Sequence, residues 1–300
     1  MNLITPSSPL TNSSNVVKLC SFSVNRICND YSRMGINVER FFKADLVHLY
    51  ECVDSGYRFY YPFSCIGDAS FYEDLSLNRT NYYSNRWEHG VTMKYLNSND
   101  SVLEIGSGFG AFLNRIKSEN IKGKGLELNP YAVKQCVQSG LDVYDRLVND
   151  EASVNANSYS IVCCFQVLEH ITDVNSFIES SISLLKMNGK LIIGVPNNNP
   201  YLFISDKYHT LNLPPHHAGL WNGKALKYLE QIFSIKLVSL EYEPLNVAYV
   251  DFLNVQLKNA NFLVRLVVRI GHKVIPNILK KVLCKYVKGR NILAVFEKVE

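Results

Sequence analysis

The stretch Val102–Gly110, Val-Leu-Glu-Ile-Gly-Ser-Gly-Phe-Gly, constrains the fold of this chain more than any other. Residues Ser101–Ile105 are mostly β-branched or apolar and predict a short buried strand. The three alternating glycines predict a tight turn, because glycine adopts positive φ at little cost. Apolar residues then recur at helical spacing, at Phe109, Phe112, Leu113 and Ile116. Strand, glycine turn and helix together predict a small-molecule cradle, since free N–H groups at a helix start point at the ligand.

Two acidic residues fit this cradle. Glu104 stands at the end of the strand, just before the first glycine, where a carboxylate would repel a phosphate and hold an amino group. Glu127 stands in the next predicted strand, Lys124–Leu128. It follows the glycines by about 20 residues, where a Rossmann-like unit places the acid that binds ribose hydroxyls. The two acids therefore favour a ligand with an amino group and a ribose.

The rest of the chain alternates between strand and helix patterns. Asn129 and Pro130 predict a helix start, as N-cap and first residue, and Gly140 predicts its end. A further helix is expected to run to Leu185 and to be closed by Asn188-Gly189. Further strands are expected at Leu141–Tyr144, Tyr159–Gln166, Lys190–Val195, Ile235–Tyr242 and Asn291–Lys298. This alternation predicts a doubly wound α/β sheet.

Four motifs in this order resemble those of the class I S-adenosylmethionine-dependent methyltransferases. They are Glu-x-Gly-x-Gly-x-Gly, Gly-Leu-Glu-Leu-Asn, Phe-Gln-Val-Leu-Glu-His and Leu-Leu-Lys-x-Asn-Gly-Lys-Leu. The resemblance implies a Rossmann-like seven-stranded sheet whose last strand is antiparallel, an active methyltransferase, and S-adenosylmethionine as cofactor. It also implies a set of cofactor-binding residues, namely Glu104, Gly106, Ser107, Gly108, Phe109, Gly110, Glu127, Leu128, Asn129 and Gln166.

Two other interpretations of the glycine turn were weighed. Gly106–Ala111 also satisfies the Gly-x-Gly-x-x-Gly/Ala pattern of dinucleotide-binding enzymes. Glu104, the position of the turn well inside the chain, and the Leu-Glu-His ending of the fourth strand argue against that class. A glycine turn that serves only packing would leave the acids at two successive strand ends unexplained.

Three histidines are the candidate catalytic residues. A hydroxyl acceptor needs a proton acceptor, and an imidazole near its ordinary pKa suits that task at neutral pH. His170 follows the fourth strand, and His216 and His217 lie in a long loop after the fifth, where an α/β site receives its substrate. We rank His217 and His216 first, because His170 could instead contact the start of its own helix.

The sequence divides into a tail and small cap over residues 1–66 and a methyltransferase domain over residues 67–300. Residues 1–15 are polar, without the apolar run of a secretion signal, and predict a frayed tail. Short strands are expected at Val16–Cys20, His48–Cys52 and Tyr57–Tyr61, and residues 70–96 are expected to form helices over the cradle.

The cap resembles the zinc ribbon that precedes some methyltransferases of bacterial polysaccharide and sugar pathways. Ser55 stands where the ribbon's second cysteine would follow Cys52. Because a tetrahedral zinc site needs four ligands, we expect a metal-free cap and no bound metal; a plain β-hairpin is the alternative. This resemblance implies a sugar or nucleotide-sugar hydroxyl as acceptor. A quinone-type or small-metabolite O-methyltransferase, and a silent fold serving as a membrane-associated subunit, remain as alternatives.

Charge and cysteines narrow the setting. A net charge of +4 gives no sign of nucleic-acid binding, and eight cysteines without a Cys-x-x-Cys pair suggest reduced thiols in a cytoplasmic protein. Residues 251–290 carry nine Lys or Arg and one acidic residue, Asp251. Lys258, Arg265, Arg269 and Lys273 fall on one helical stripe. No apolar run in this helical insertion is long enough to span a bilayer, and we expect the insertion either to lie on the inner membrane face or to pack on the domain.

Overall fold

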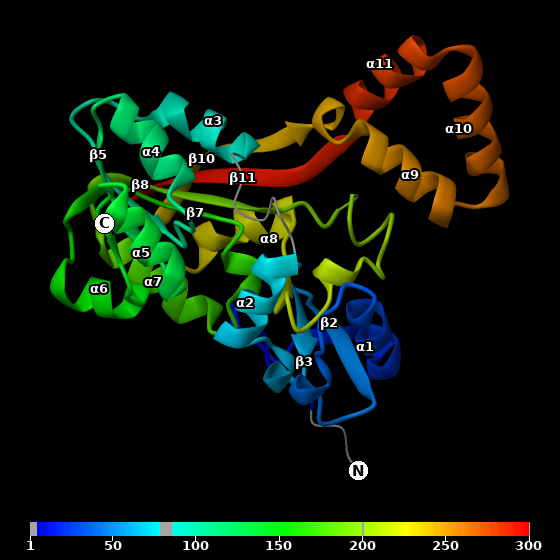
Figure 1. The fold of residues 1–300 in the computed structure, drawn as a ribbon, viewed down its shortest axis with the longest axis horizontal. Helices are drawn as coiled ribbons and strands as arrows, with labels where there is room; N and C mark the ends of the chain where they lie inside the picture. The colour runs from blue at the N-terminus through cyan, green and yellow to red at the C-terminus, as the bar shows by residue number, and fades with distance from the viewer. Residues whose placement is uncertain (1–4, 79–85, 200, 300) are drawn as a thin grey trace.

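The computed structural model describes residues 5–78, 86–199 and 201–299, and its larger layer is a seven-stranded sheet of order β10-β11-β8-β7-β4-β5-β6 (Figure 1). β11 pairs antiparallel with β8 and β10, and the other neighbours pair parallel. This is the sheet that the resemblance implied. Its strands are β4 (Ser101–Ile105), β5 (Lys122–Leu126), β6 (Val143–Tyr144), β7 (Tyr159–Phe165), β8 (Leu185–Pro196), β10 (Ile235–Pro244) and β11 (Lys288–Lys298).

Helices cover both faces of this sheet, and the central strand β7 shows why. Its residues Ile161 and Cys163 pack in one apolar cluster, while Val162 and Cys164 pack in another. The first cluster is shared with α3 (Trp87–Thr92), α4 (Ala111–Ser118) and α5 (Pro130–Gln138). The second is shared with α6 (Val148–Val154), α7 (Val174–Ser183) and α8 (Gly223–Tyr228). A strand buried on both faces reads as a continuous apolar run, as the sequence predicted.

Several element boundaries differ from the prediction. β5 ends at Leu126, so Glu127 follows the strand instead of lying in it. Phe109 lies in the glycine turn and not in the helix, because α4 begins only at Ala111. The helix before β8 ends at Ser183, and Asn188 and Gly189 lie within β8 instead of closing the helix. Asn188 has φ +61° and the pairing of β8 with β7 shifts between Leu185 and Lys190, so this turn interrupts a strand.

A second, antiparallel sheet of order β1-β2-β3-β9 forms the N-terminal layer. It contains β1 (Val16–Ser23), β2 (Leu46–Cys52), β3 (Arg58–Tyr61) and β9 (Gly219–Leu220), with α1 (Val24–Ser32) and α2 (Ala69–Asn78) beside it. The three strands predicted before residue 66 are present, and two of them are longer than expected. The fourth strand, β9, comes from residues 219–220, more than 150 residues after β3. Residues 16–61 therefore do not complete this sheet alone.

The frayed tail is wrong for the part of it that the structure describes. Leu10 is fully buried in the core cluster of the larger sheet, and its carbonyl accepts a hydrogen bond from Asn175 Nδ2 at 3.3 Å. Thr11 Oγ1 lies 3.4 Å from Cys52 Sγ. The polar composition concealed one apolar anchor; residues 1–4 lie outside the described residues.

Three helices between β10 and β11 stand away from the sheets (Figure 1). They are α9 (Tyr249–Asn259), α10 (Phe262–Val274) and α11 (Pro276–Tyr286). Pro276 begins a helix, as its missing N–H allows. Asn261 caps α10 by accepting a hydrogen bond from the backbone N–H of Val264 at 3.0 Å, so Lys258 belongs to a separate helix and not to the predicted stripe.

Candidate functional site

A cavity of about 730 Å³ lies at the carboxyl ends of β4, β5 and β7, and the glycine turn forms part of its wall. Gly106, Gly108 and Gly110 have φ of +74°, +53° and +74°, as the sequence predicted. The backbone N–H groups of Gly106 and Ser107 both donate to the carbonyl of Leu126, at 2.8 and 3.1 Å. The turn is therefore fastened to the end of β5, and its position relative to Glu127 is fixed.

Glu127 lies directly after β5 and holds the turn from the other side. One carboxylate oxygen accepts the N–H of Gly108 and the other accepts the N–H of Asn129, each at 2.8 Å. Asn129 in turn caps α5, accepting from Tyr131 and Ala132 as predicted. Glu127, Leu128 and Asn129 all line the cavity. A carboxylate oriented by two backbone donors keeps lone pairs for the hydroxyls of a ribose.

Glu104 and Ser107 supply polar atoms that face the same cavity. Both residues are buried, and among the described residues Glu104 Oε2 and Ser107 Oγ have no hydrogen-bond partner. Burial, and then the neighbouring Glu127, raise the pKa of Glu104 well above its usual value. An unpartnered buried carboxyl is costly, and an ammonium group of a ligand would satisfy it.

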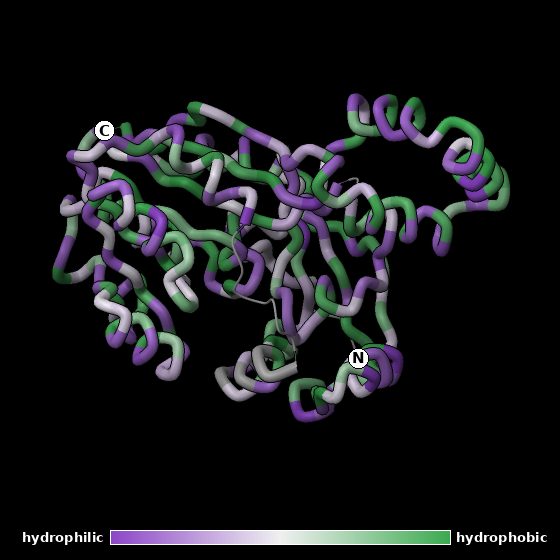
Figure 2. The backbone as a smooth tube through the Cα atoms, turned by 45° about the horizontal axis from the view of Figure 1, so that its top comes forward, coloured by the Kyte–Doolittle hydropathy of each residue, from purple (hydrophilic) through white to green (hydrophobic). Residues whose placement is uncertain are grey.

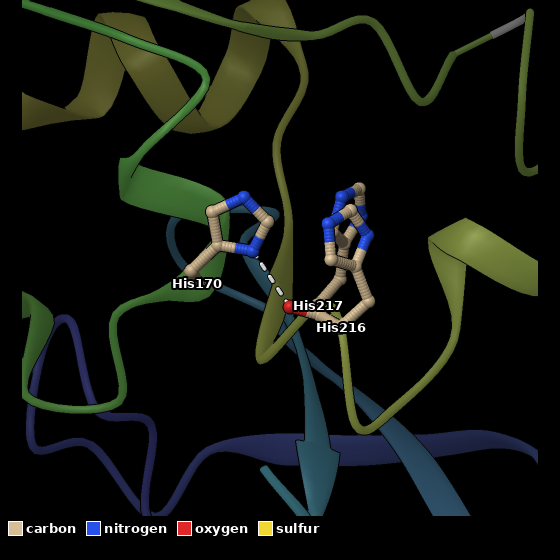
Figure 3. Close-up of side chains that lie close together, drawn as sticks. All are labelled: His170, His216 and His217. Atoms are coloured by element: carbon tan, nitrogen blue, oxygen red, sulfur yellow. Dashed lines mark hydrogen bonds between the residues drawn. The ribbon is translucent and has the colours of Figure 1, made fainter. Parts of the chain in front are cut away.

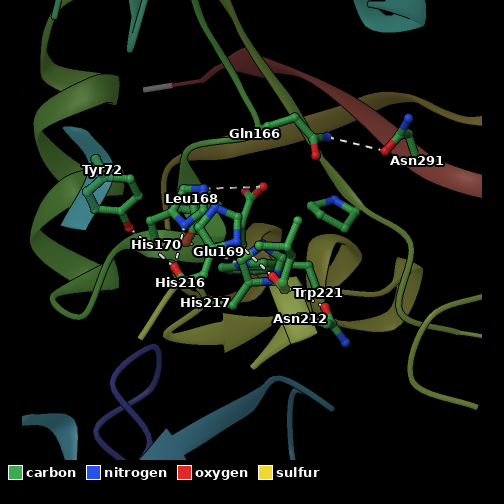
Figure 4. Close-up of polar contacts among 12 residues, drawn as sticks. Tyr72, Gln166, Leu168, Glu169, His170, Asn212, His216, His217, Trp221 and Asn291 are labelled. Atoms are coloured by element: carbon green, nitrogen blue, oxygen red, sulfur yellow. Dashed lines mark hydrogen bonds and ion pairs between the residues drawn. The ribbon is translucent and has the colours of Figure 1, made fainter. Parts of the chain in front are cut away.

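Gln166 lies at the end of β7, on the cavity wall, with an unusual backbone. Its φ is +58°, a conformation that is strained for a side chain other than glycine. Its N–H donates to the carbonyl of Gly194 at 2.7 Å, and its side-chain amide donates to Glu88 at 2.8 Å and to Asn291 at 3.4 Å (Figure 4). Gln166 thus ties the ends of three strands to α3 beside the cavity.

The three histidines come together, as Figure 3 shows. The ring centroid of His170 lies 4.6 Å from that of His216 and 5.1 Å from that of His217, and His216 stacks on His217 at 4.7 Å. Each Nδ1 has an oxygen partner: the His216 carbonyl for His170 at 2.6 Å, the Leu211 carbonyl for His216 at 2.7 Å, and Asn212 Oδ1 for His217 at 3.1 Å. Because these oxygens only accept, each Nδ1 carries the proton and Nε2 carries the lone pair.

The structure reverses the predicted ranking of these histidines. His170 lines the cavity, whereas His216 and His217 are buried and are not among its lining residues. His170 is packed against Tyr72, whose ring lies 5.6 Å away edge-on and also lines the cavity. The loop position of His216 and His217 correctly placed them near the cavity, but the 3-10 helix Leu168–His170 places His170 on the cavity wall.

Burial keeps His170 and His217 uncharged near neutral pH. It lowers the pKa of His170 to about 4 and that of His217 well below its usual value. Glu169 is buried beside His170, with 3.8 Å between Glu169 Oε1 and His170 Nε2, and burial raises its pKa to about 8. Near neutral pH the protonated acid and the neutral imidazole avoid the cost of a buried charge.

The histidine trio is also the set of described residues that could hold a metal ion, with its ligand atoms within 4.8 Å of one another. Nitrogens that share a tetrahedral zinc lie about 3.3 Å apart, given Zn–N bonds of about 2.0–2.1 Å. The rings of His216 and His217 are stacked at 24°, so their nitrogens point in similar directions and not at a common point. The trio as it stands is wider than a formed zinc site.

Several cavity residues were not predicted from the sequence. Phe63 and Ile66 come from the N-terminal layer, and Arg86 and His89 from the start of α3. Burial lowers the pKa of His89 to about 4. The aromatic stretch after residue 70 indicated helices over the cradle, but no local pattern marks the loop around Phe63 as a cavity wall. Tyr82 and Tyr83, part of that predicted stretch, lie outside the described residues.

Comparison with known proteins agrees with the fold. A family model described as "Methyltransferase domain" matches residues 80–264. A ubiquinone biosynthesis O-methyltransferase of Vibrio campbellii is 27% identical over 164 residues, which cover 49% of this chain and 70% of the relative. One of Xanthomonas axonopodis pv. citri is 32% identical over 108 residues, covering 34% and 45%. The solved methyltransferase–activator complex of Haloferax volcanii has the same fold, with a TM-score of 0.53, 14% identity, and 77% of this chain and 96% of that one covered.

Proposed function

We propose that this chain methylates a hydroxyl of a sugar or nucleotide-sugar in surface polysaccharide biosynthesis. The premise is that the chain belongs to the methyltransferase domain family and is an S-adenosylmethionine-dependent methyltransferase. The cofactor, S-adenosylmethionine, supplies a methyl group on a sulfonium that is already an activated leaving group. The protein therefore contributes mainly position and exclusion of water, together with a proton acceptor for the hydroxyl.

The cofactor end of the cavity fits this molecule. The buried, unpartnered carboxyl oxygen of Glu104 would pair with the ammonium of the methionine part. Glu127, already oriented by the N–H groups of Gly108 and Asn129, would accept hydrogen bonds from the ribose hydroxyls. The positive-φ glycines leave the backbone open to close approach at the turn.

The observation that supports a sugar acceptor is the mixed wall at the other end of the cavity. Aromatic rings of Phe63 and Tyr72 line it beside the polar side chains of Ser64, Asp68 and His170. A pyranose ring has apolar C–H faces and hydroxyls at its edge, so aromatic rings and hydrogen-bonding groups in one wall suit it. A purely apolar acceptor would gain no hydrogen bond from the polar part of this wall.

His170 is the residue we propose as proton acceptor. Its Nδ1–H donates to the carbonyl of His216, which leaves the Nε2 lone pair to accept the hydroxyl proton. Its depressed pKa keeps it neutral and ready to accept at pH 7. The carbonyl of His216, 2.6 Å from Nδ1, would stabilise the imidazolium once it forms. The rings of His216 and His217 pack against the ring of His170 and support its orientation.

The test is methyl transfer measured by mass spectrometry with a panel of nucleotide-sugars and a panel of catechols. We expect a product mass increased by one methyl group with a nucleotide-sugar, and His170→Gln to lower kcat roughly 100-fold or more without weakening cofactor binding. The matched control is His272→Gln, on the exposed side of α10. Turnover of catechols alone would reject the sugar assignment.

A quinone-type O-methyltransferase is the second candidate, because the relatives are named ubiquinone biosynthesis O-methyltransferases. Methylation of a catechol, together with no turnover of any nucleotide-sugar, would support this second candidate. Both candidates place a hydroxyl near His170, so the His170→Gln variant should lose activity in either case. Full activity of that variant would remove His170 from the reaction.

A further inference from the structure

The helices α10 and α11 expose an apolar face where a globular protein usually presents polar residues. In α10 the residues Leu263, Val267, Ile270 and Val274 are between 54% and 70% exposed. Their spacing of four, three and four residues places them within about 60° of the helix circumference. Only Val268 of this helix is buried, on another side, so the stripe is not the face that packs against the protein.

The next helix continues the same feature. In α11 the residues Ile278, Val282 and Tyr286 follow one another at four-residue spacing and are between 47% and 73% exposed. No residue of α11 is fully buried. Figure 2 shows hydrophobic and hydrophilic residues alternating along both helices, which stand away from the rest of the molecule.

Cations flank the exposed apolar stripes. In α10 the side chains of Arg265, Arg269 and Lys273 share a second stripe, centred about 130° around the helix from the apolar one, and all three are exposed. Exposed Lys280, Lys281 and Lys285 follow in α11. Within the part of this segment that the structure describes, one ion pair forms, between Arg290 and Asp251 at 3.5 Å. The remaining cations make the segment a strongly positive surface.

The segment has a firm attachment to the body. Tyr249, Phe252 and Leu253 of α9 are buried in an apolar cluster with Tyr201, Leu245 and Val268. α10 packs against α9 and α11. The outer helices are thus held out on a packed base, and their apolar stripes are presented to the surroundings.

We infer that α10 and α11 dock on the surface of an anionic lipid bilayer, with the apolar stripes in the headgroup region and the cations on lipid phosphates. A helix with a large apolar stripe and lysines or arginines beside it is the arrangement that binds such surfaces. No helix among the described residues is long and apolar enough to cross a membrane, which leaves the arrangement lying on the surface.

Charge decides between this occupant and a second copy of the chain. Two copies that met through α10 and α11 would bring six exposed cations to each side of the contact, and like charges oppose that approach. An anionic bilayer offers both an apolar layer and opposite charge. This inference does not depend on the sugar assignment, because neither helix lines the cavity.

The experiment is co-sedimentation of the full chain with vesicles of phosphatidylcholine alone, or with equal parts of phosphatidylglycerol, at low and high salt. We expect binding to the anionic vesicles only, reduced at high salt because salt screens exposed charges. Arg265→Gln with Arg269→Gln should lower binding roughly 30-fold, and Leu263→Gln with Val267→Gln should lower it at least about tenfold.

Two matched controls separate this surface from general effects. Lys134→Gln with Lys186→Gln removes the same charge from other exposed positions, and Val137→Gln with Val154→Gln removes exposed apolar side chains elsewhere. Both controls should bind like the wild type, and every variant should keep its affinity for S-adenosylmethionine.

Three results would overturn the inference. One is an absence of sedimentation with anionic vesicles at low salt, and another is equal binding to neutral and anionic vesicles. The third is self-association in analytical ultracentrifugation that the Leu263→Gln, Val267→Gln variant abolishes, which would show that a second copy covers this face.

Discussion

Glu127 carries a prediction at the scale of single residues. Its carboxylate is oriented by the N–H groups of Gly108 and Asn129 and faces the cavity, so Glu127→Ala should weaken S-adenosylmethionine binding. Hydrogen bonds to a charged group are worth about 1.5–3 kcal/mol, which corresponds to a loss of about 10- to 100-fold. Isothermal calorimetry measures the dissociation constant, with Glu179→Ala, an exposed position on α7, as control. Unchanged affinity in a folded Glu127→Ala variant would remove this residue from the site.

Glu169 gives a prediction about pH. Its pKa is raised from 4.5 to about 8 by burial, so the native protein keeps a proton there that the unfolded chain releases. The resulting stability is fully present below about pH 4.5 and is lost as the pH rises toward 8, on the order of 4 kcal/mol in total. Urea unfolding at pH 5, 6.5 and 8 should therefore show that the stability of Glu169→Gln relative to the wild type rises with pH. The contributions of other buried groups such as Glu104 and His217 are common to both proteins and cancel in this difference.

Activity tests the protonation state of Glu169 separately from stability. Because its carboxyl is protonated near neutral pH, the neutral amide of Glu169→Gln should keep kcat at pH 7 close to the wild-type value while raising stability at pH 8. A pH dependence of unfolding identical in wild type and Glu169→Gln would show that another group is responsible.

At the scale of elements, the sequence predicted what local pattern determines. The glycine turn, the caps of α5 and the apolar run of β7 are each predicted by a pattern of a few neighbouring residues, and all three are present. The errors lie where distant residues decide. Leu10 is buried by a core that forms far along the chain, and Asn188 turns inside β8 because β7 pairs on both sides of it.

The histidines show the same limit within the site. Their positions after strand ends predicted one neighbourhood, and the structure brings all three together. Which of them lines the cavity depends on the short helix at Leu168–His170, and no local pattern fixes that helix. Lining residues such as Phe63 reach the cavity because the two layers pack together, and no local sequence pattern predicts that packing.

The N-terminal sheet carries a prediction about metal. Ser55 replaces the ligand that a zinc ribbon would need, and a cluster rich in aromatic rings, with Tyr31, Phe41 and Phe71, supplies a core in its place. Elemental analysis of the purified protein should find no stoichiometric zinc, and a chelator should leave the unfolding midpoint unchanged. Zinc that is lost together with the fold of this sheet would contradict the prediction. Retention of the metal in a Cys52→Ser variant and its loss in His216→Ala with His217→Ala would assign it to the histidines.

The whole molecule is joined by the segment 219–224. β9 pairs with β3, and Trp221 beside it is fully buried, with its ring centroid 4.5 Å from that of Tyr57 and its Nε1–H donating to the carbonyl of Leu168 at 3.4 Å. Asn222 donates to the carbonyl of Gly56 at 3.1 Å and Lys224 to that of Val53 at 3.0 Å. The N-terminal sheet is therefore held by a segment that the larger layer positions.

This coupling predicts a single unfolding transition for the two layers. Far-ultraviolet circular dichroism and the fluorescence of Trp221, measured in a Trp87→Phe background, should give coincident urea curves, because the N-terminal sheet takes its fourth strand, β9, from the segment that the larger layer positions. Trp221→Ala should lower the free energy of unfolding by about 3–5 kcal/mol, as expected for a large buried side chain. It should also lower methyl transfer, since the N-terminal layer supplies Phe63 and Ile66 to the cavity. Two separate transitions, with the N-terminal sheet unfolding first, would show that the layers are independent and that the acceptor wall can be lost while the cofactor site survives.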